Sequence, residues 1–332
     1  MQILITGGAG YVGSHTAKQL ARAGYEPVVL DNLRNGHRWA VRWGPLIEMD
    51  LADCEGLQRV FRSHKIHAVL HFAGFASVAE SLQAPALYFQ NNFVNTLTLL
   101  EAMRSHGVDK IVFSSSCTTY GYPDQVPIPE GHKQAPISPY GESKLMVENT
   151  LTWFERAYGL RWVALRYFNA AGADPEGEVG EAHHPETHLI PRAIAAACGD
   201  GGDLEIFGAD YDTQDGTAVR DYIHVSDLAV AHVKAVKRLI DGESSAAFNL
   251  GIGKGYSVRQ VIGAVQAVAG RRVPVRLQSR RAGDAPAMVA DTALAERILG
   301  WAPQYTSLEP IVSTAWQWYE RVKTRGLPRI QP

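Results

Sequence analysis

The chain has 332 residues, of which 46% are hydrophobic and 20% are charged, so it is long enough for one large or two modest domains with a full apolar core. The net charge is −2 and no basic tract occurs, which disfavours nucleic acid or an acidic membrane surface as a partner. Three widely spaced cysteines, no expected signal peptide and no apolar run of membrane-spanning length favour a reduced, cytoplasmic protein.

The first predicted element is a buried parallel strand, because residues 3–5 form a short apolar run. Three glycines at three-residue spacing follow it: Gly7, Gly10 and Gly13. A helix over 14–23 and a second strand over 27–30 complete a βαβ unit with the glycine turn typical of a dinucleotide site. Glycine lets a pyrophosphate approach the backbone, and the helix N-terminus attracts its charge. A flavodoxin-like turn that binds no cofactor is the alternative.

Two carboxylates at strand ends extend this prediction. Asp31 closes the second strand, where it would bond the ribose hydroxyls of a dinucleotide and repel a 2′-phosphate, so it favours NAD over NADP. Asp50 ends the third predicted strand. It either accepts a hydrogen bond from the adenine amino group or caps the helix expected over 52–63.

Small and polar residues follow the next two predicted strands. A fourth strand over 67–72 leads into Ala73-Gly74, whose small size leaves space for a ligand at the edge of the sheet. A long helical stretch over 82–106 comes next. A fifth strand over 110–113 then ends in the serines Ser114–Ser116, which are polar where apolar packing would otherwise be expected.

A further helix carries a candidate acid–base pair. Ser138 is a plausible N-cap and Pro139 suits the first turn. Tyr140 and Lys144 lie one helical turn apart and share a face. A phenol has a pKa near 10, and a neighbouring ammonium favours the phenolate, which makes a competent base. An exposed Tyr–Lys pair is the alternative, but the glycine turn and Ser116 favour catalysis.

The second half of the chain begins with a glycine-rich, acidic loop over 172–184. We predict helices over 189–198 and 227–240, with a strand over 247–250 that returns to the first sheet. The fold class predicted is α/β, a Rossmann-type doubly wound parallel sheet with a smaller α/β substrate-binding domain. The NAD-binding domain would comprise residues 1–172 and about 223–251, and the second domain about 173–222 and 252–332.

The combined motifs resemble the extended short-chain dehydrogenase/reductases. These are Gly7-Gly-Ala-Gly-Tyr-Val-Gly13, Asp31-Asn32, Ser114-Ser-Ser116 and Tyr140-x-x-x-Lys144. Later motifs are similar to those of the UDP-glucose 4-epimerase family within that group: Arg166-Tyr-Phe-Asn-Ala-Ala-Gly172, Ile206-Phe-Gly208, Asp215-Gly-Thr, Val219-Arg-Asp-Tyr-Ile-His-Val225, Phe248-Asn-Leu-Gly251 and Arg280-Arg-Ala-Gly-Asp284. The resemblance covers the chain from residue 2 to about residue 318.

The resemblance implies three sets of site residues. The catalytic set would be Ser116, Tyr140 and Lys144. NAD would be bound by Gly7, Gly10, Tyr11, Val12, Gly13, Asp31, Asn32, Asp50, Leu51, Phe72, Ala73, Gly74, Asn91, Ser114, Tyr140, Lys144 and Tyr167. The UDP-sugar would be bound by Ser116, Asn169, His188, Leu189, Phe207, Arg220, Arg281, Asp284 and Met288. Arginine matches diphosphate oxygens and phenylalanine offers a flat face to uracil. Surface ion pairs for the two arginines and core packing for Phe207 are the alternatives.

Several residues depart from the family pattern. Ala76 stands where some epimerases carry a phosphate-facing lysine, and Cys117, which we interpret as a small buried residue, stands where many carry alanine. His188 replaces an asparagine found against the diphosphate in some members. With His183 and His184 it suggests a metal site, but Pro185 interrupts the run and no cysteine assists, so we expect no metal.

The resemblance implies interconversion of UDP-glucose and UDP-galactose through a 4-keto sugar, in a homodimer formed by helices near 82–106 and 139–158. Met288 matches a position that gates the sugar's 2-substituent, unless it is core packing. A UDP-pentose or UDP-N-acetylhexosamine 4-epimerase would share the motifs. A 4,6-dehydratase would need an acid–base pair where Cys117-Thr118 stand, and a non-enzymatic NAD sensor would not need the intact catalytic set.

Overall fold

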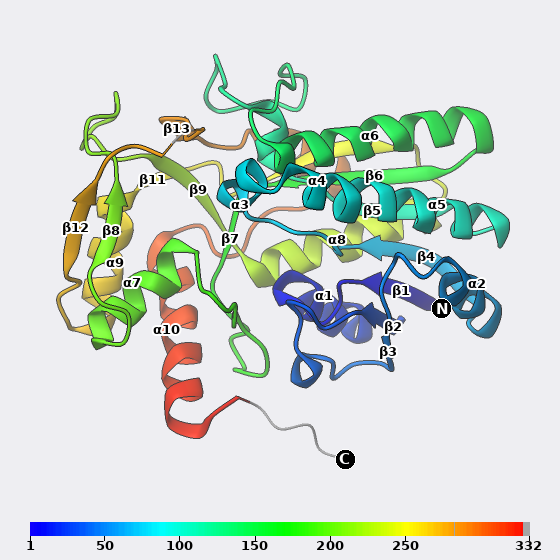
Figure 1. The fold of residues 1–332 in the computed structure, drawn as a ribbon, viewed down its shortest axis with the longest axis horizontal. Helices are drawn as coiled ribbons and strands as arrows, with labels where there is room; N and C mark the ends of the chain where they lie inside the picture. Colours follow the sequence, from blue (N-terminus) through cyan, green and yellow to red (C-terminus); the bar gives the residue numbers. More distant parts are fainter. Residues whose placement is uncertain (282, 328–332) are drawn as a thin grey trace.

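A seven-stranded parallel sheet forms the larger part of the molecule (Figure 1). The computed structural model describes residues 1–281 and 283–327; Ala282 of the Arg280–Asp284 motif and the predicted domain end at 328–332 lie outside them. The strand order is β10 (Ala246–Leu250), β6 (Arg161–Tyr167), β5 (Lys110–Ser114), β4 (Ile66–His71), β1 (Gln2–Thr6), β2 (Glu26–Asp31) and β3 (Leu46–Glu48). This order, with helices on both faces, confirms the predicted fold class.

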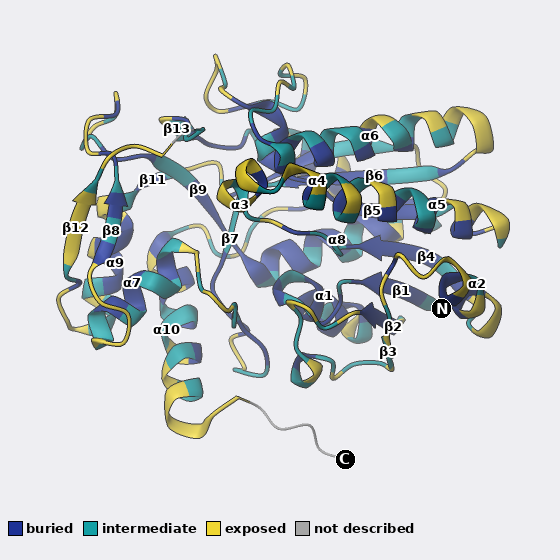
Figure 2. Ribbon diagram, in the orientation of Figure 1, coloured by how far each residue is buried: buried dark blue, intermediate teal, exposed yellow. Residues whose placement is uncertain are grey.

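Alternating side chains of the central strand serve two separate cores. Ile3 and Ile5 pack beneath α1 (Tyr11–Arg22) and α8 (Val225–Ile240). Leu4 points to the opposite face, which is covered by α2 (Cys54–Ser63), α5 (Asn95–Ser105) and α6 (Pro139–Tyr158). Figure 2 shows the central strands buried between these helices. A continuous apolar run is therefore needed, because both faces of the sheet are covered.

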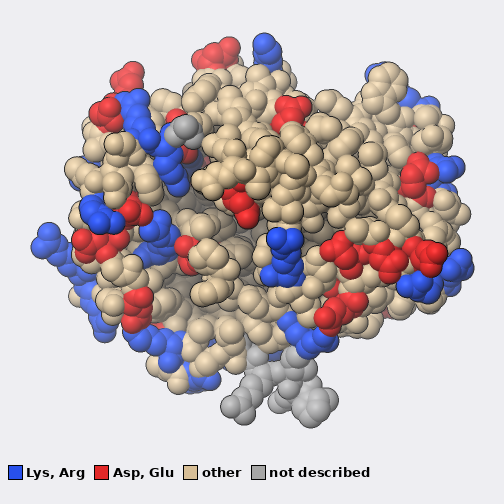
Figure 3. Space-filling view, in the orientation of Figure 1, with Lys and Arg blue, Asp and Glu red and all other residues tan. Residues whose placement is uncertain are grey.

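The smaller part of the molecule has its own sheets and core. Strands β8 (Leu204–Phe207) and β12 (Val275–Gln278) pair in parallel, and β9 (Val219–His224) pairs with β7 (Asn169–Ala171), β11 (Gly255–Ser257) and β13 (Ala287–Met288). Helices α7 (Leu189–Cys198), α9 (Val258–Ala269) and α10 (Leu308–Arg325) enclose a separate apolar cluster. On the face drawn in Figure 3, the surface is hollowed between the two parts. None of the described helices has the length and apolarity that crossing a membrane requires.

Several elements differ from the sequence prediction. The stretch 82–106 is divided into α3 (Val78–Gln83), α4 (Pro85–Tyr88), the π-helical η2 (Phe89–Val94) and α5. Pro85 explains the first break, because proline disfavours helical backbone at the preceding residue. The cap of α2 is Asp53, which accepts from the Gly56 N–H at 2.8 Å, so Asp50 does not cap this helix. The remaining short helices are η1 (Arg38–Ala40), η3 (Cys117–Tyr120) and η4 (Ala295–Leu299).

Candidate active site

The glycine turn between β1 and α1 lies directly against the segment that follows β4. A Cβ on Gly7, whose φ is +72°, would come within 2.5 Å of the Ala73 nitrogen, and one on Gly13 within 2.3 Å of the Gly7 oxygen. Only glycine fits these two positions. Tyr11 at the start of α1 donates its hydroxyl to the Gly172 carbonyl at 2.6 Å, while Val12 packs into the apolar cluster beneath. The turn is thus tightly packed and leads into the N-terminus of α1, the end of a helix that attracts an anion.

Asp31 is buried at the end of β2. Its carboxylate oxygens accept from the backbone N–H groups of Ala9 at 2.9 Å and Leu33 at 2.8 Å. Burial raises the pKa of Asp31 above its usual range, although these hydrogen bonds oppose the change. Asn32 follows Asp31 and donates to the Asp50 carboxylate at 2.6 Å. The residues predicted to bind the ribose and the adenine, Asp31 and Asp50, are therefore close together.

Asn92, which the sequence reasoning missed, organises the segment after β4. Its side-chain oxygen accepts from the Phe75 N–H at 2.8 Å, and its nitrogen donates to the Phe75 carbonyl at 3.0 Å and to the Ser143 hydroxyl at 3.2 Å. The predicted residue Asn91 donates to Asn92 at 2.9 Å. Leu51 is buried, and Phe72, Ala73 and Gly74 lie partly buried at this edge. A Cβ on Gly74 would lie 3.6 Å from the Lys144 ammonium, which connects the cofactor segment with α6.

The predicted catalytic helix begins as expected, with Ser138 as N-cap accepting from the Gly141 N–H. Both Tyr140 and Lys144 are buried, and the Lys144 ammonium lies 5.9 Å from the centre of the Tyr140 ring. Lys144 donates to the Ser114 carbonyl at 2.8 Å, and the Ser114 and Tyr167 hydroxyls are 2.7 Å apart. The structure therefore brings the ends of β5 and β6 and the first turns of α6 together.

Burial dominates the electrostatics of this pair. Burial raises the pKa of Tyr140 well above its usual value, although a contact with the Ser116 hydroxyl opposes the change. Burial also lowers the pKa of Lys144 to about 8, against the attraction of Glu148. Burial is thus the largest influence on the Tyr140 phenol, and it favours the protonated form.

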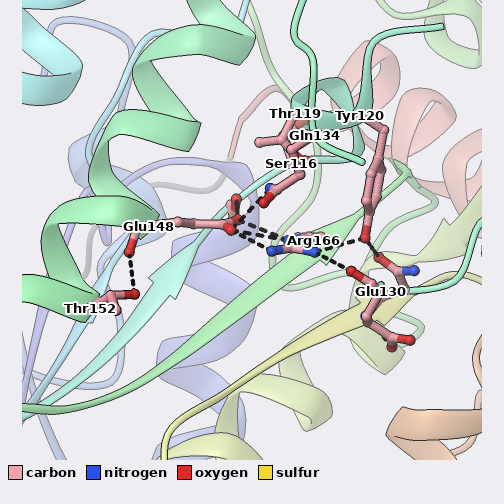
Figure 4. A network of polar contacts seen from close by, with 10 residues as sticks. Ser116, Thr119, Tyr120, Glu130, Gln134, Glu148, Thr152 and Arg166 are labelled. Carbon is pink, nitrogen blue, oxygen red and sulfur yellow. Dashed lines mark hydrogen bonds and ion pairs between the residues drawn. The ribbon is translucent and has the colours of Figure 1, made fainter. Parts of the chain in front are cut away.

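A buried ion pair joins β6 to α6, close to Ser116 (Figure 4). Arg166 of β6 donates to Glu148 of α6 at 2.6 and 3.0 Å, and Ser115 donates to the same carboxylate at 2.5 Å. Arg166 also donates to the Tyr120 hydroxyl at 3.0 Å. Glu148 stands one turn after Lys144, which was the only sequence signal for it. The network fixes Ser115 and therefore the neighbouring Ser116.

Ser116 begins η3 and accepts hydrogen bonds from the Thr118 N–H at 3.2 Å and the Thr118 hydroxyl at 3.0 Å. Cys117 is buried in an apolar cluster that includes Phe168 and Met288. Burial raises the pKa of the Cys117 thiol to about 12, which agrees with its interpretation as an unreactive core residue.

Four predicted substrate residues meet at the edge of the smaller part. Arg220 lies 3.5 Å from Asp284 and donates to two backbone carbonyls at 2.8 Å each. Arg281 donates to Asp284 at 3.0 Å, and its guanidinium lies 4.7 Å from the centre of the Phe207 ring. Phe207 is half-buried, so part of its ring is accessible to a ligand. Two arginines and one aromatic face are thus available to a nucleotide diphosphate.

Met288 pairs in register with Arg220 on adjoining strands β13 and β9. It is buried in one cluster with Cys117, whose neighbour is Ser116, so it is in contact with both the predicted substrate residues and the predicted catalytic segment. Asn169 on β7 pairs with Tyr222 of β9 and is half-buried. The packing alternative for Met288 and the gating prediction both fit this position.

His188 and Leu189 stand at the start of α7, where His188 belongs to an ionic cluster. The His188 and His183 imidazoles both contact the Glu181 carboxylate, His183 at 2.9 Å, and Glu186 lies 3.8 Å from His183. Although burial opposes both changes, this pairing lowers the pKa of Glu181 to about 2 and raises that of His183 to about 10. The ligand atoms of these four residues lie within 4.8 Å of one another, so the absence of a metal stays a prediction.

Comparisons with known proteins agree with this geometry. The chain matches the NAD dependent epimerase/dehydratase family over residues 3–251. It is 52% identical to UDP-glucose 4-epimerase of Rhizobium meliloti (strain 1021) over 324 residues, 98% of each chain. The structure of UDP-glucose 4-epimerase from Brucella ovis in complex with NAD is 52% identical, with a TM-score of 0.93 over 95% of this chain and 97% of that one. The UDP-Glc/GlcNAc 4-epimerase of Campylobacter jejuni is 42% identical, with a TM-score of 0.84 over 96% and 99%. The chain therefore belongs to the NAD dependent epimerase/dehydratase family.

Proposed function

We propose that this protein interconverts UDP-glucose and UDP-galactose by inversion at C4, using a bound NAD. The observation that carries the proposal is the meeting of Tyr140, Lys144 and Ser114–Ser116 at the sheet edge beside the glycine turn. Its likeness over nearly the full length to proteins named UDP-glucose 4-epimerase supports the same activity.

The residues present fit NAD. The cradle at Gly7 and Gly13, which a Cβ would fill, would hold the diphosphate, and Asp31 would bind the ribose hydroxyls. When bound, NAD⁺ supplies a hydride acceptor that is restored in each catalytic cycle. We propose that the other residues predicted to bind the cofactor also contact NAD at this edge of the sheet.

Tyr140 would take the proton of the C4 hydroxyl, and Ser116 would hydrogen-bond the reacting oxygen. The Lys144 pKa of about 8 leaves the amine largely protonated near neutral pH, so it can lower the phenol's pKa together with the charge of the cofactor. Arg220, Arg281 and Phe207 would hold the UDP group, which leaves the 4-keto sugar free to turn about its diphosphate linkage and present its other face.

Substrate range is the finer part of the proposal. Met288 is long but unbranched and can change rotamer, so we expect plain hexoses to be preferred and N-acetylated sugars to react slowly. A UDP-pentose is the alternative substrate. A 4,6-dehydratase activity is disfavoured, because it would need an acid–base pair at positions 117 and 118. Burial raises the pKa of the Cys117 thiol to about 12, and the Thr118 hydroxyl donates to Ser116.

A cytoplasmic homodimer is also part of the proposal. Large apolar side chains are exposed on the helices expected at the interface: Leu82, Val94, Trp153 and Tyr158. Light scattering of the purified chain should give twice the monomer mass, whereas a monomer at micromolar concentration would contradict the proposed dimer.

We also propose the two domains expected from the sequence, one of residues 1–172 with about 223–251 and the other of about 173–222 with 252–332.

The activity itself is tested by incubating purified protein with UDP-galactose and no added cofactor. UDP-glucose should appear until the two sugars reach a constant ratio, because bound NAD is restored in each turnover. NAD should be released when the protein is denatured. A protein that releases only NADP, or that carries NAD and converts neither UDP-sugar, would refute the proposal.

A further inference from the structure

Arg34 reaches across the proposed cofactor cleft. It belongs to the turn after β2, yet its guanidinium carbon lies 4.6 Å from the centre of the Phe75 ring, which follows β4. In the sheet, β1 separates β2 from β4. The contact therefore joins the segments on either side of β1, at the end where its glycine turn begins.

The backbone of this turn is held firmly. The N–H groups of Leu33 and Arg34 donate to the side chains of Asp31 at 2.8 Å and Asn32 at 3.0 Å. Leu33 has a φ of +57°, a conformation that non-glycine residues seldom adopt. The His37 N–H also donates to the Ala9 carbonyl of the glycine turn at 2.9 Å. Arg34 thus projects from a fixed base rather than from a loose loop.

The Arg34 side chain is exposed and positively charged. Within 1–281 and 283–327, no carboxylate forms an ion pair with Arg34, whose guanidinium faces an aromatic ring instead. The first turn of α1 has no acidic residue, and Gly10 offers no side-chain cap. Two positive groups, the guanidinium and the helix N-terminus, would both be stabilised by a diphosphate between them.

We infer that Arg34 is a positioning residue, a cationic clasp that donates to the diphosphate of the bound dinucleotide and closes the cleft over it. The inference rests on the proposed NAD site. Phe75 packs in one cluster with Tyr88 and Tyr140, and its ring centre lies 5.7 Å from that of Tyr88. Through Phe75, Arg34 is therefore also connected to the aromatic cluster that contains Tyr140.

The test is the rate at which NAD leaves the purified protein after dilution. Arg34→Ala should release NAD about 10-fold faster or more, because a charge-assisted contact is lost. Arg34→Lys should be intermediate, since an ammonium keeps the charge but not the planar fork. Arg62→Ala on α2 removes another exposed arginine and should match the wild type.

The outcomes separate this inference from the proposed function. Wild-type and Arg34→Ala proteins that release NAD at equal rates would overturn the clasp alone. A folded wild-type protein that carries no NAD and binds none when it is added would overturn the cofactor site and the clasp together. UDP affinity, measured by calorimetry, should be the same in Arg34→Ala and the wild type; a parallel loss would indicate general damage and would also contradict the clasp.

Discussion

At the scale of single residues, the account depends most on the Tyr140 hydroxyl. Tyr140→Phe keeps the buried ring and its packing but removes the group that would take the C4 proton. We expect kcat to fall by roughly 10²–10⁴-fold, the usual cost of losing a general base, with UDP binding retained. Steady-state kinetics and UDP titration measure the two effects. A variant with wild-type kcat would remove Tyr140 from the mechanism.

Met288 has two alternative roles, packing in the buried cluster or gating access of the sugar's 2-substituent. If it gates the sugar's 2-substituent, Met288→Ala should raise the ratio of kcat/KM for UDP-N-acetylglucosamine over UDP-glucose, and Met288→Tyr should lower it. If it serves only the buried cluster with Cys117, both variants should lose stability while the ratio stays constant. Kinetics with both substrates, combined with thermal denaturation, would distinguish the two roles.

Residues whose placement depends on local spacing were predictable from the sequence. Gly7 and Gly13 repeat within one turn, and Tyr140 and Lys144 share one helix face. The pKa direction of Tyr140 was not predictable, because it depends on how completely the surrounding elements bury the phenol. Asn92 and the contact of Ser115 with Glu148 were missed for a related reason: the partners come from distant segments that meet only in the folded chain.

At the scale of elements, α6 is positioned by the Glu148–Arg166 pair. Glu148→Gln would leave a buried arginine without its counter-charge, a change that typically costs about 3–5 kcal/mol in the free energy of unfolding. Urea denaturation should show this loss. Glu101→Gln removes the exposed partner of Arg104 and should cost at most about 1 kcal/mol. Equal effects of the two substitutions would contradict the proposed support role.

The elements themselves were predicted well where hydrophobic pattern and caps agree. Helix α7 has the predicted limits, and Ser138 and Pro139 begin α6 as expected. The prediction of one long helix over 82–106 was wrong in detail, because the apolar periodicity continues through Pro85 whereas the regular helix is interrupted there. The cap alternative for Asp50 was wrong because α2 begins at Cys54 rather than at residue 52, and pattern alone locates a helix start poorly.

At the scale of the whole molecule, the predicted return of β10 to the first sheet was correct. The approach of Arg220 and Met288 to the Ser116 segment could be inferred only from family resemblance. It results from β9 and β13 packing beside η3, and no local pattern encodes that contact.

The central claim is that the configuration at C4 is inverted while the hydride stays within one protein molecule, for which bound NAD would supply the hydride acceptor. The most direct measurement is conversion of UDP-galactose in D₂O with no added cofactor, followed by NMR of the UDP-glucose formed. Our account predicts full conversion to equilibrium with no deuterium at C4, because the hydride never exchanges with solvent. Deuterium at C4 of the product would contradict the account.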